Sequence, residues 1–180
     1  MVQKKYMNQI TEIETCSLAD TATILALYED AMQLQIQKNR VVWPRFNKAF
    51  IEKEIRELRQ WKLLTYDQIA CNWAVTFDDK EIWGDREHRN AVYIHRIVTR
   101  PSFRGNRCID VIVAWAKNYA VAMGKQYVRL DTLGNNTRLI EHYTSAGFTF
   151  LGITTLTDTT NLPAHYHREP RCCRFEMEIQ

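Results

Sequence analysis

The segment from Ala91 to Ile109, AVYIHRIVTRPSFRGNRCI, constrains the fold more than any other part of this chain. Its residues have a period of two between Tyr93 and Val98, and the segment is rich in β-branched and aromatic side chains, which is typical of a β-strand. Pro101 ends the strand, and Gly105 next to Asn106 tolerates unusual backbone angles. The sequence therefore predicts a strand that runs directly into a tight turn.

After the turn, the hydrophobic period changes to that of a helix. Apolar side chains recur at helical spacing from Ile109 to Met123, and Gly124 closes the helix. A turn in this position exposes free backbone N–H groups at the positive end of the helix dipole. The turn is surrounded by Arg100, Arg104 and Arg107. We therefore expect it to bind phosphate.

Two short motifs follow one another along this part of the chain. The turn reads Arg104, Gly105, Asn106, Arg107, Cys108 and Ile109, and the next helix carries Asn136, Leu139, Ile140, Tyr143 and the run Ala146, Gly147 and Phe148. Over residues 93–148 the chain resembles the GCN5-related N-acetyltransferases, the GNAT family, whose acetyl-CoA loop has the pattern Gln/Arg-x-x-Gly-x-Gly/Ala. Arg104 matches the first position, whereas Arg107 and Ile109 replace the two small residues. The second motif is intact.

The resemblance implies an α/β fold with a mixed α+β sheet, as in acyl-CoA N-acyltransferases. Such a sheet is mostly antiparallel, splays at its central strands and carries flanking helices. The split would lie between Tyr93–Thr99 and Tyr127–Thr132, where the pantetheine arm of acetyl-CoA pairs with the backbone. The length of 180 residues fits one domain over residues 1–180.

The resemblance also implies which residues contact acetyl-CoA. The amides of Gly105, Asn106, Arg107 and Cys108 would bind the pyrophosphate, helped by the charge of Arg104 and Arg107. The alternative is a solvated basic turn.

Further along the cofactor site, Ile97 and Val98 on the central strand are expected to line the thioester end. The Val98 amide would face the thioester oxygen. Asn136 is expected to cap its helix and to contact the pantetheine arm.

Two residues are candidates for proton transfer. In the family, a tyrosine at the position of Tyr143 protonates the departing thiolate, although Tyr143 could also be a core residue. His95 on the central strand could deprotonate the attacking amine, or it could be structural. The acidic residues Glu81, Asp85 and Glu87 compete for the role of base, or are merely solvated.

Aromatic and basic residues in loops are candidates for the acceptor site. Trp43, Arg45 and Trp83 would flank the acceptor amine in the resembling fold, as would His165, Tyr166 and His167. Alternatively, these side chains cover the edge of the core. No carboxylate or third histidine stands at ligand spacing near His165 and His167, so we expect no metal.

The remaining elements follow from pattern and turn residues. Strands are predicted at Gln9–Glu14, Lys62–Tyr66, Ile69–Phe77, Tyr127–Thr132, Phe148–Thr154 and Arg171–Ile179. Helices are predicted at Ser17–Asn39, Lys48–Gln60 and Asn136–Gly147. A hairpin is expected at Asp67 and Gln68, and polar loops at Asp78–Asn90 and Thr155–Glu169. The strand, helix and strand from Tyr93 to Thr132 predict one parallel pair.

Composition indicates the class of protein. The net charge of +3 is small, and the arginines cluster near one turn, which argues against general nucleic-acid binding. A basic nucleic-acid module is therefore the weakest alternative. The 5 cysteines show no metal-ligand spacing, which favours reduced thiols in the cytoplasm. Neither a signal peptide nor a membrane-spanning run is expected.

We therefore expect an enzyme that transfers an acetyl group from acetyl-CoA to a primary amine by direct attack. The amine would belong to a small molecule or a peptide, and the family often forms homodimers. The alternative is a non-catalytic domain that binds acyl-CoA or has a regulatory role, because two small residues of the loop are missing.

Overall fold

The computed structural model describes residues 11–179, which contain one seven-stranded sheet in the order β1-β2-β3-β4-β5-β7-β6. The strands are β1 (Thr11–Thr15), β2 (Gln60–Thr65), β3 (Gln68–Thr76), β4 (Ala91–Thr99), β5 (Tyr127–Leu133), β6 (Thr149–Thr155) and β7 (Arg171–Glu178). Only β4 and β5 pair in parallel, and all other neighbours in this sheet are antiparallel. The predicted mixed sheet with one parallel pair is confirmed.

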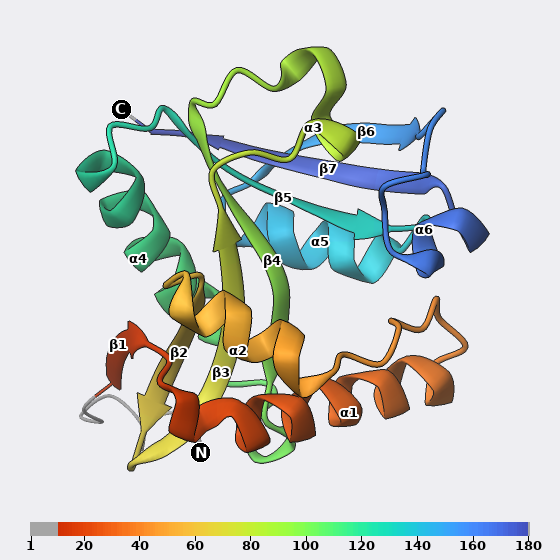
Figure 1. Ribbon diagram of the computed structural model, residues 1–180. Helices are drawn as coiled ribbons and strands as arrows, with labels where there is room; N and C mark the ends of the chain where they lie inside the picture. The colour runs from red at the N-terminus through yellow and green to blue at the C-terminus, as the bar shows by residue number, and fades with distance from the viewer. Residues whose placement is uncertain (1–10, 180) are drawn as a thin grey trace, which may run out of the picture.

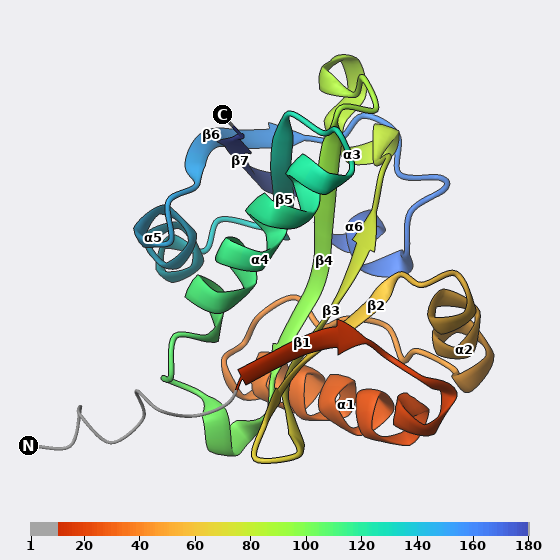
Figure 2. The ribbon, with the colours of Figure 1, turned by 90° about the vertical axis from the view of Figure 1, so that its left-hand side faces the viewer.

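Helices cover both faces of the sheet (Figures 1 and 2). They are α1 (Thr21–Gln37), α2 (Lys48–Arg56), α3 (Lys80–Trp83), α4 (Cys108–Ala122), α5 (Thr137–Ser145) and α6 (Ala164–Arg168). The largest apolar cluster lies between one face of the sheet and the helices α4 and α5, which cover that face. On the other face, α1 and α2 cover one half of the sheet, and α3 with the β6–β7 connection covers the other half.

The sheet opens between its two parallel strands. Strands β4 and β5 pair only over Ala91–Tyr93 and Tyr127–Arg129, and they diverge beyond this point (Figure 1). The divergence begins next to a bulge in β4, where Arg96 and Ile97 together stand opposite a single residue of β3. Arg96 has a φ of 51°, which is the left-handed region that bulges use and non-glycine residues avoid. The predicted split between the central strands is therefore present.

A buried polar network holds this bulge. The guanidinium of Arg96 donates to both carboxylate oxygens of Glu54 on α2, at 2.7 and 2.6 Å, and to the hydroxyl of Tyr28 on α1 at 3.3 Å. Glu54 is only 1% exposed and also accepts a hydrogen bond from Gln60 at 2.7 Å. Asn72, which pairs with β4 at the bulge, donates to Gln60 at 3.0 Å. The network therefore links two helices to the position where the sheet splits.

Several predicted boundaries were wrong. The second helix ends at Arg56 rather than Gln60, because Leu58 has a φ of 55° and leaves the helix. The hairpin turns at Tyr66 and Asp67, one residue earlier than predicted, since both residues have positive φ angles. The expected loop at 78–90 contains α3 and the 3-10 helix at Gly84–Arg86, and the expected loop at 155–169 contains α6.

Other local predictions are confirmed. The Ser17 amide donates to Asp20 at 2.7 Å in a capping box, and Asn136 caps α5 by accepting from the Leu139 amide at 3.4 Å. Cys172 and Cys173 enter different apolar clusters on opposite faces of β7. The first strand begins at Thr11, and the predicted start at Gln9 lies outside the described residues. Within residues 11–179, no helix is long and apolar enough to cross a membrane.

Replacing Glu54 with alanine should strongly destabilise the protein. The change leaves the Arg96 guanidinium without its carboxylate in a buried site, which costs about 3–5 kcal/mol. Urea unfolding measures the loss. Glu52→Ala on the same helix is the matched control, because Glu52 makes only surface ion pairs with Lys48 and Arg56, each worth no more than about 1 kcal/mol. Equal losses in the two variants would contradict a structural role for the network.

Candidate active site

The gap between β4 and β5 exposes backbone groups of β4. Beyond the parallel pairing, β4 has only β3 as a neighbour. The Arg100 amide donates to the carbonyl oxygen of Ala70 on β3 at 2.9 Å. Because hydrogen-bonding direction alternates along an antiparallel strand, the Val98 amide also faces β3 and the Thr99 amide faces the gap, whereas Ile97 lies in the bulge, where this alternation is interrupted. The alternation favours a donor other than the Val98 amide for the thioester oxygen.

Three ionisable side chains meet at the point where the sheet opens. His95 lies on β4, Asp131 lies on β5, and Asp79 follows β3. One ligand-type atom from each lies within 4.8 Å of the others. His95 therefore approaches Asp131 across the gap that separates their strands. A cation could occupy such a trio, but hydroxyls of Thr76 and Tyr166 already bond to His95 and Asp131, which favours proton chemistry here.

The two carboxylates share a poorly solvated environment. Burial, and then the negative charge of Asp131, raise the pKa of Asp79. Burial also raises the pKa of Asp131, against a hydrogen bond that its carboxylate accepts from the Tyr166 hydroxyl at 3.1 Å. One oxygen of Asp79, Oδ2, is closed to solvent and has no hydrogen-bond partner among the described residues. Two such carboxylates hold a proton more readily than exposed aspartates do.

His95 is neutral in this site. Burial and the positive charges of Arg96 and Arg59 lower the pKa of His95 to about 3. Its Nε2 atom lies 2.9 Å from the Thr76 hydroxyl. A histidine with such a low pKa accepts a proton weakly.

The sequence reasoning missed Asp79 and Asp131. The sequence contained one indication of this site. Asp131 lies near the end of a predicted strand that is parallel to the central strand, and the ends of these two strands flank the split. The three acidic residues that the sequence suggested as alternative bases lie elsewhere. Glu81 and Asp85 are exposed on α3 and the turn after it, and Glu87 accepts from the backbone amide of Asp79 at 3.2 Å.

Tyr143 lies on the opposite face of the sheet from the carboxylates. Its ring packs against Phe148 and Phe175 in the main apolar cluster, with centroid distances of 6.1 and 5.3 Å. Burial raises the pKa of Tyr143, so its hydroxyl keeps its proton at neutral pH. Both readings of Tyr143, as a core residue and as a proton donor, are compatible with this position.

The basic turn keeps the backbone shape of a glycine loop. Gly105 has a φ of 88°, and Arg107 caps α4 in the left-handed region with a φ of 50°. The Arg107 side chain is exposed and donates to Asp110 at 2.9 Å. Cys108 begins α4 and is partly buried against the main cluster, whereas Arg104 and Asn106 are exposed. The large side chain at position 107 therefore leaves the local backbone conformation intact.

A surface hollow of about 290 Å³ lies beside this turn, between α4 and α5. It is lined by Arg107, Ile109, Arg138, Glu141, His142 and Ser145. Arginines from the two helices therefore border one hollow next to the free amides of the first turn of α4.

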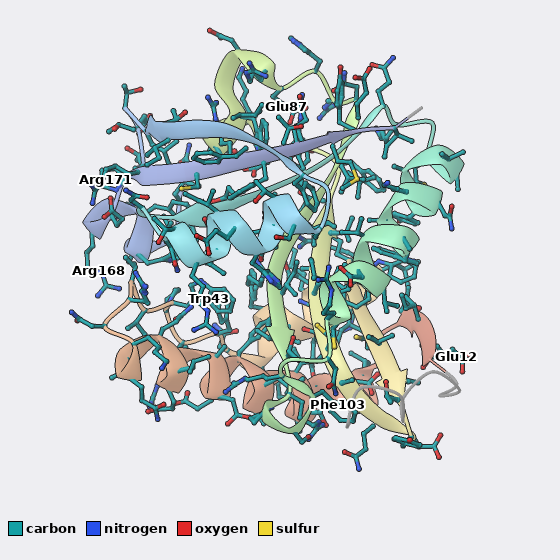
Figure 3. All side chains as sticks on the ribbon, turned by 180° about the vertical axis from the view of Figure 1, so that it is seen from behind. Glu12, Trp43, Glu87, Phe103, Arg168 and Arg171 are labelled. Atoms are coloured by element: carbon teal, nitrogen blue, oxygen red, sulfur yellow. The ribbon has the colours of Figure 1, made fainter. Side chains whose placement is uncertain are left out.

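The candidate acceptor residues divide between two places. Trp43 packs against Tyr28 near α1, and its loop contacts α6, where Arg168 donates to the Val42 carbonyl oxygen at 3.3 Å (Figure 3). Arg45 is exposed and lies 3.9 Å from a carboxylate oxygen of Glu29. Trp83 is 1% exposed and belongs to the cluster under α3. Trp43 and Trp83 therefore do not share a cluster.

The two histidines of α6 also differ in environment. His165 is buried, and its Nδ1 atom has no hydrogen-bond partner among the described residues. Burial, followed by the charge of Arg168, lowers the pKa of His165 to about 4. His167 is exposed, and its ring lies 2.7 Å from the Thr159 carbonyl oxygen.

Comparison with known proteins gives a consistent result. The model of the acetyltransferase (GNAT) family matches residues 39–148. The N-acetyltransferase YesJ of Bacillus subtilis is 28% identical over 74 residues, which span 41% of this chain and 41% of that protein.

Solved structures share the fold. A GNAT-family acetyltransferase from Listeria monocytogenes superposes with a TM-score of 0.73 at 19% identity, covering 96% of this chain and 100% of the other. The yncA protein of Salmonella typhimurium, solved with its cofactor acetyl-CoA, superposes with a TM-score of 0.66 at 15% identity, covering 94% of each chain.

Replacing Asp79 with asparagine should change how stability depends on pH. The raised pKa of Asp79 means that the folded protein holds a proton that the unfolded chain releases near its ordinary pKa of about 4. Wild-type stability should therefore fall as the pH rises from about 4 towards the raised value, by about 1.4 kcal/mol per unit of elevation. The variant should be more stable at about pH 8 and equal near pH 4.

Urea unfolding across this pH range measures the difference. Asp78→Asn is the control, because Asp78 is the exposed neighbour of Asp79. Parallel curves for the wild type and Asp79→Asn would mean that Asp79 keeps an ordinary pKa.

Proposed function

Because the chain belongs to the GNAT acetyltransferase family, we propose that it transfers an acetyl group from acetyl-CoA to a primary amine by direct attack. The membership confirms the resemblance found in the sequence motifs. The observation that carries the proposal is the open gap between β4 and β5, which has free backbone amides on β4 and a pair of carboxylates at its closed end.

The residues of the gap and the turn fit acetyl-CoA. The backbone of β4 from Ile97 to Thr99 faces the gap and offers hydrogen bonds to the amides of a pantetheine arm. The turn offers the amides of Gly105, Arg107 and Cys108 to the pyrophosphate, with Arg104 and Arg107 as charged neighbours, whereas the Asn106 amide donates to the Phe103 carbonyl oxygen at 3.3 Å. Asn136 caps the helix on the other side of the gap. Acetyl-CoA, when bound, supplies an activated acetyl group on a thioester.

We assign the stabilisation of negative charge on the thioester oxygen to the Ile97 amide. Ile97 lies in the bulge of β4, where the regular pairing with β3 is interrupted, whereas Val98 pairs with Asn72 of β3. A fixed backbone N–H group needs no reorganisation when charge develops beside it.

The pair of Asp79 and Asp131 is the proposed proton acceptor. An amine enters as an ammonium ion and must lose a proton before it can attack the carbonyl carbon. Asp79 already holds a proton at neutral pH because its pKa is raised to about 9, so the carboxylate of Asp131, whose pKa is raised to about 6, takes the proton of the amine. This assignment replaces His95, whose pKa of about 3 makes it a weak base, and leaves His95 as a neutral neighbour of the pair.

Tyr143 is the proposed proton donor. As the new carbon–nitrogen bond forms and the carbon–sulfur bond breaks, the departing sulfur gains negative charge and needs a proton. The Tyr143 hydroxyl stays protonated at neutral pH because burial raises its pKa. The ammonium gives one proton to the carboxylate pair before attack. Tyr143 supplies the proton of the thiol, and the second proton that the nitrogen loses as the amide forms returns to Tyr143.

Tyr143→Phe should lower kcat by roughly 10²-fold without changing the affinity for acetyl-CoA, because it removes a proton donor and keeps the ring that packs in the core. Steady-state kinetics and a calorimetric titration with acetyl-CoA measure the two effects separately. Tyr119→Phe on α4 is the control, because it removes a tyrosine hydroxyl outside the proposed site. Unchanged kcat in Tyr143→Phe would remove the hydroxyl from the mechanism.

A non-catalytic role in binding acyl-CoA is the alternative, and Arg107 and Ile109 at the two small positions favour it. Calorimetric titration with acetyl-CoA, dephospho-CoA and desulfo-CoA tests cofactor binding, and release of free thiol with a panel of amines tests transfer. Binding with transfer supports the enzyme. Binding without transfer to any amine supports the alternative, and no binding refutes both.

A further inference from the structure

Arg174 on β7 has a guanidinium without a protein partner. The side chain is partly buried, its Nε atom is closed to solvent, and it makes no hydrogen bond or ion pair within the described chain. Glu176, two positions further along the strand, is already bound by Arg129, with an oxygen–nitrogen distance of 2.7 Å. A partly desolvated charge without a counterion is costly, so an anion beside Arg174 would be favoured.

The neighbouring Arg129 shows how this part of the sheet satisfies an arginine. Its guanidinium donates to Glu176 at 2.8 Å and to the carbonyl oxygen of Arg86 at 2.9 Å. Both guanidinium groups pack against Trp83, with 4.6 Å from Cζ of Arg129 and 5.7 Å from Cζ of Arg174 to the ring centroid. Arg174 therefore has a fixed position on an apolar surface and lacks the acceptors that Arg129 has.

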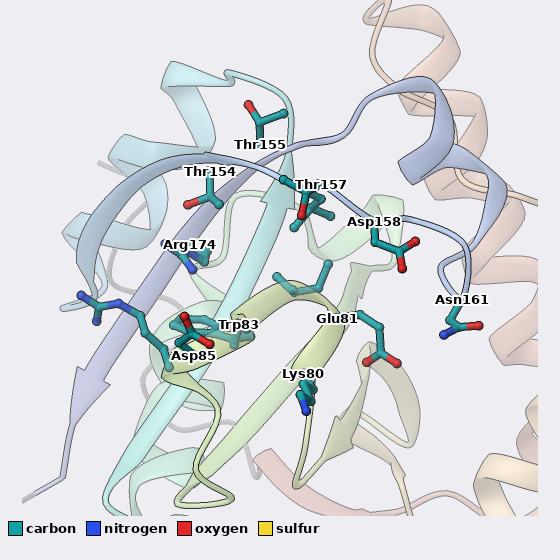
Figure 4. A pocket seen from close by; sticks show the side chains of 14 residues that line it. Lys80, Glu81, Trp83, Asp85, Thr154, Thr155, Thr157, Asp158, Asn161 and Arg174 are labelled. Carbon is teal, nitrogen blue, oxygen red and sulfur yellow. The ribbon is translucent and has the colours of Figure 1, made fainter.

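Arg174 lines a pocket of about 490 Å³ between the α3 region and the start of the β6–β7 connection. In the close view, Arg174 and Thr154 lie at one end, whereas Glu81, Asp158 and Asn161 lie at the other (Figure 4). None of the three ionisable residues at the opening of the sheet is among the described residues that line this pocket. The pocket is therefore distinct from that group, and its volume suits a small molecule.

Positive charge dominates the end of the pocket at Arg174. Arg86 also lines the pocket, and its side chain makes no ion pair within the described residues. Burial, and then the positive charge of Arg86, lower the pKa of Arg174, so the two guanidinium groups repel each other. A small anion between them would relieve this repulsion. The exposed carboxylates of Glu81 and Asp158 at the far end would repel an extended polyanion.

We infer that this pocket is a binding site for a small anionic molecule, held through a carboxylate or phosphate group at Arg174 and Arg86 and separate from the proposed site of acetyl transfer. Oxygens of both groups match the paired N–H donors of a guanidinium. The hydroxyl of Thr154, at the same end as Arg174, is a further donor. The inference does not depend on the proposed acetyl transfer.

Calorimetric titration of the whole protein with inorganic phosphate and with acetate tests the inference, at an ionic strength kept constant with sodium chloride. At least one of the two anions should bind with a Kd in the millimolar range or lower. Phosphate reports recognition of a phosphate group, and acetate reports recognition of a carboxylate. Absence of binding by both anions would overturn the inference.

Variants of Arg174 identify the residue responsible. Arg174→Gln should weaken this binding by roughly tenfold or more, and Arg174→Lys should keep part of the affinity, because it retains the charge and loses the planar fork of donors. Without added anion, Arg174→Gln should unfold at the same urea concentration as the wild type or at a higher one, because it removes a charge that has no counterion. A marked loss of stability would mean that the guanidinium already has a partner in the protein, and would overturn the inference.

The basic turn before α4 is the competing place for an anion, so Arg107→Gln is the matched control. Arg107 is an exposed arginine that pairs with Asp110, and it does not line the pocket of Arg174. Binding through Arg174 should persist in Arg107→Gln. Loss of binding in Arg107→Gln with full affinity in Arg174→Gln would place the anion at the turn and refute the proposed pocket. Acetyl transfer is assayed separately, so either proposal can fail while the other stands.

Discussion

The rest of the structure depends on the bulge in β4, and the ion pair between Glu54 and Arg96 holds this bulge in place. It joins α2 to the bulge of β4 in a site where Glu54 is 1% exposed. A left-handed arginine inside a strand is unfavourable by itself, and the contact of its Nη2 atom with both oxygens of a buried carboxylate offsets this cost. Because the bulge redirects β4, the parallel pairing with β5 stops and the sheet opens.

The opened sheet has two chemically different sides. On one side, α4 and α5 bring the basic turn, Arg138 and Tyr143 to the gap, which suits a long polyanionic cofactor with a thioester end. On the other side lie Asp79, His95 and Asp131. In the proposed reaction, the gap would let acetyl-CoA and the acceptor approach from opposite faces of the sheet, so that neither has to displace the other.

The turn before α4 departs from the family pattern at Arg107, which nevertheless has a positive φ angle. Glycine at position 107 would adopt a positive φ without cost, and Arg107 adopts one with a φ of 50°. Its side chain pairs with Asp110 on the first turn of the helix. The conformational requirement of the loop is therefore met by a residue that also adds a positive charge beside the hollow between α4 and α5.

Local patterns in the sequence determined most of the secondary structure, including the helix caps at Ser17 and Asn136, and they also determined the parallel pair of strands. These features could be predicted because hydrophobic period, capping residues and turn residues act over only a few positions of the chain. Tertiary structure decided the rest. Asp79 and Asp131 are 52 positions apart and meet only because three strands bring them to one point. Their raised pKa values, the low pKa of His95 and the unpaired Arg174 depend on burial and on neighbours from other elements, which no local pattern encodes.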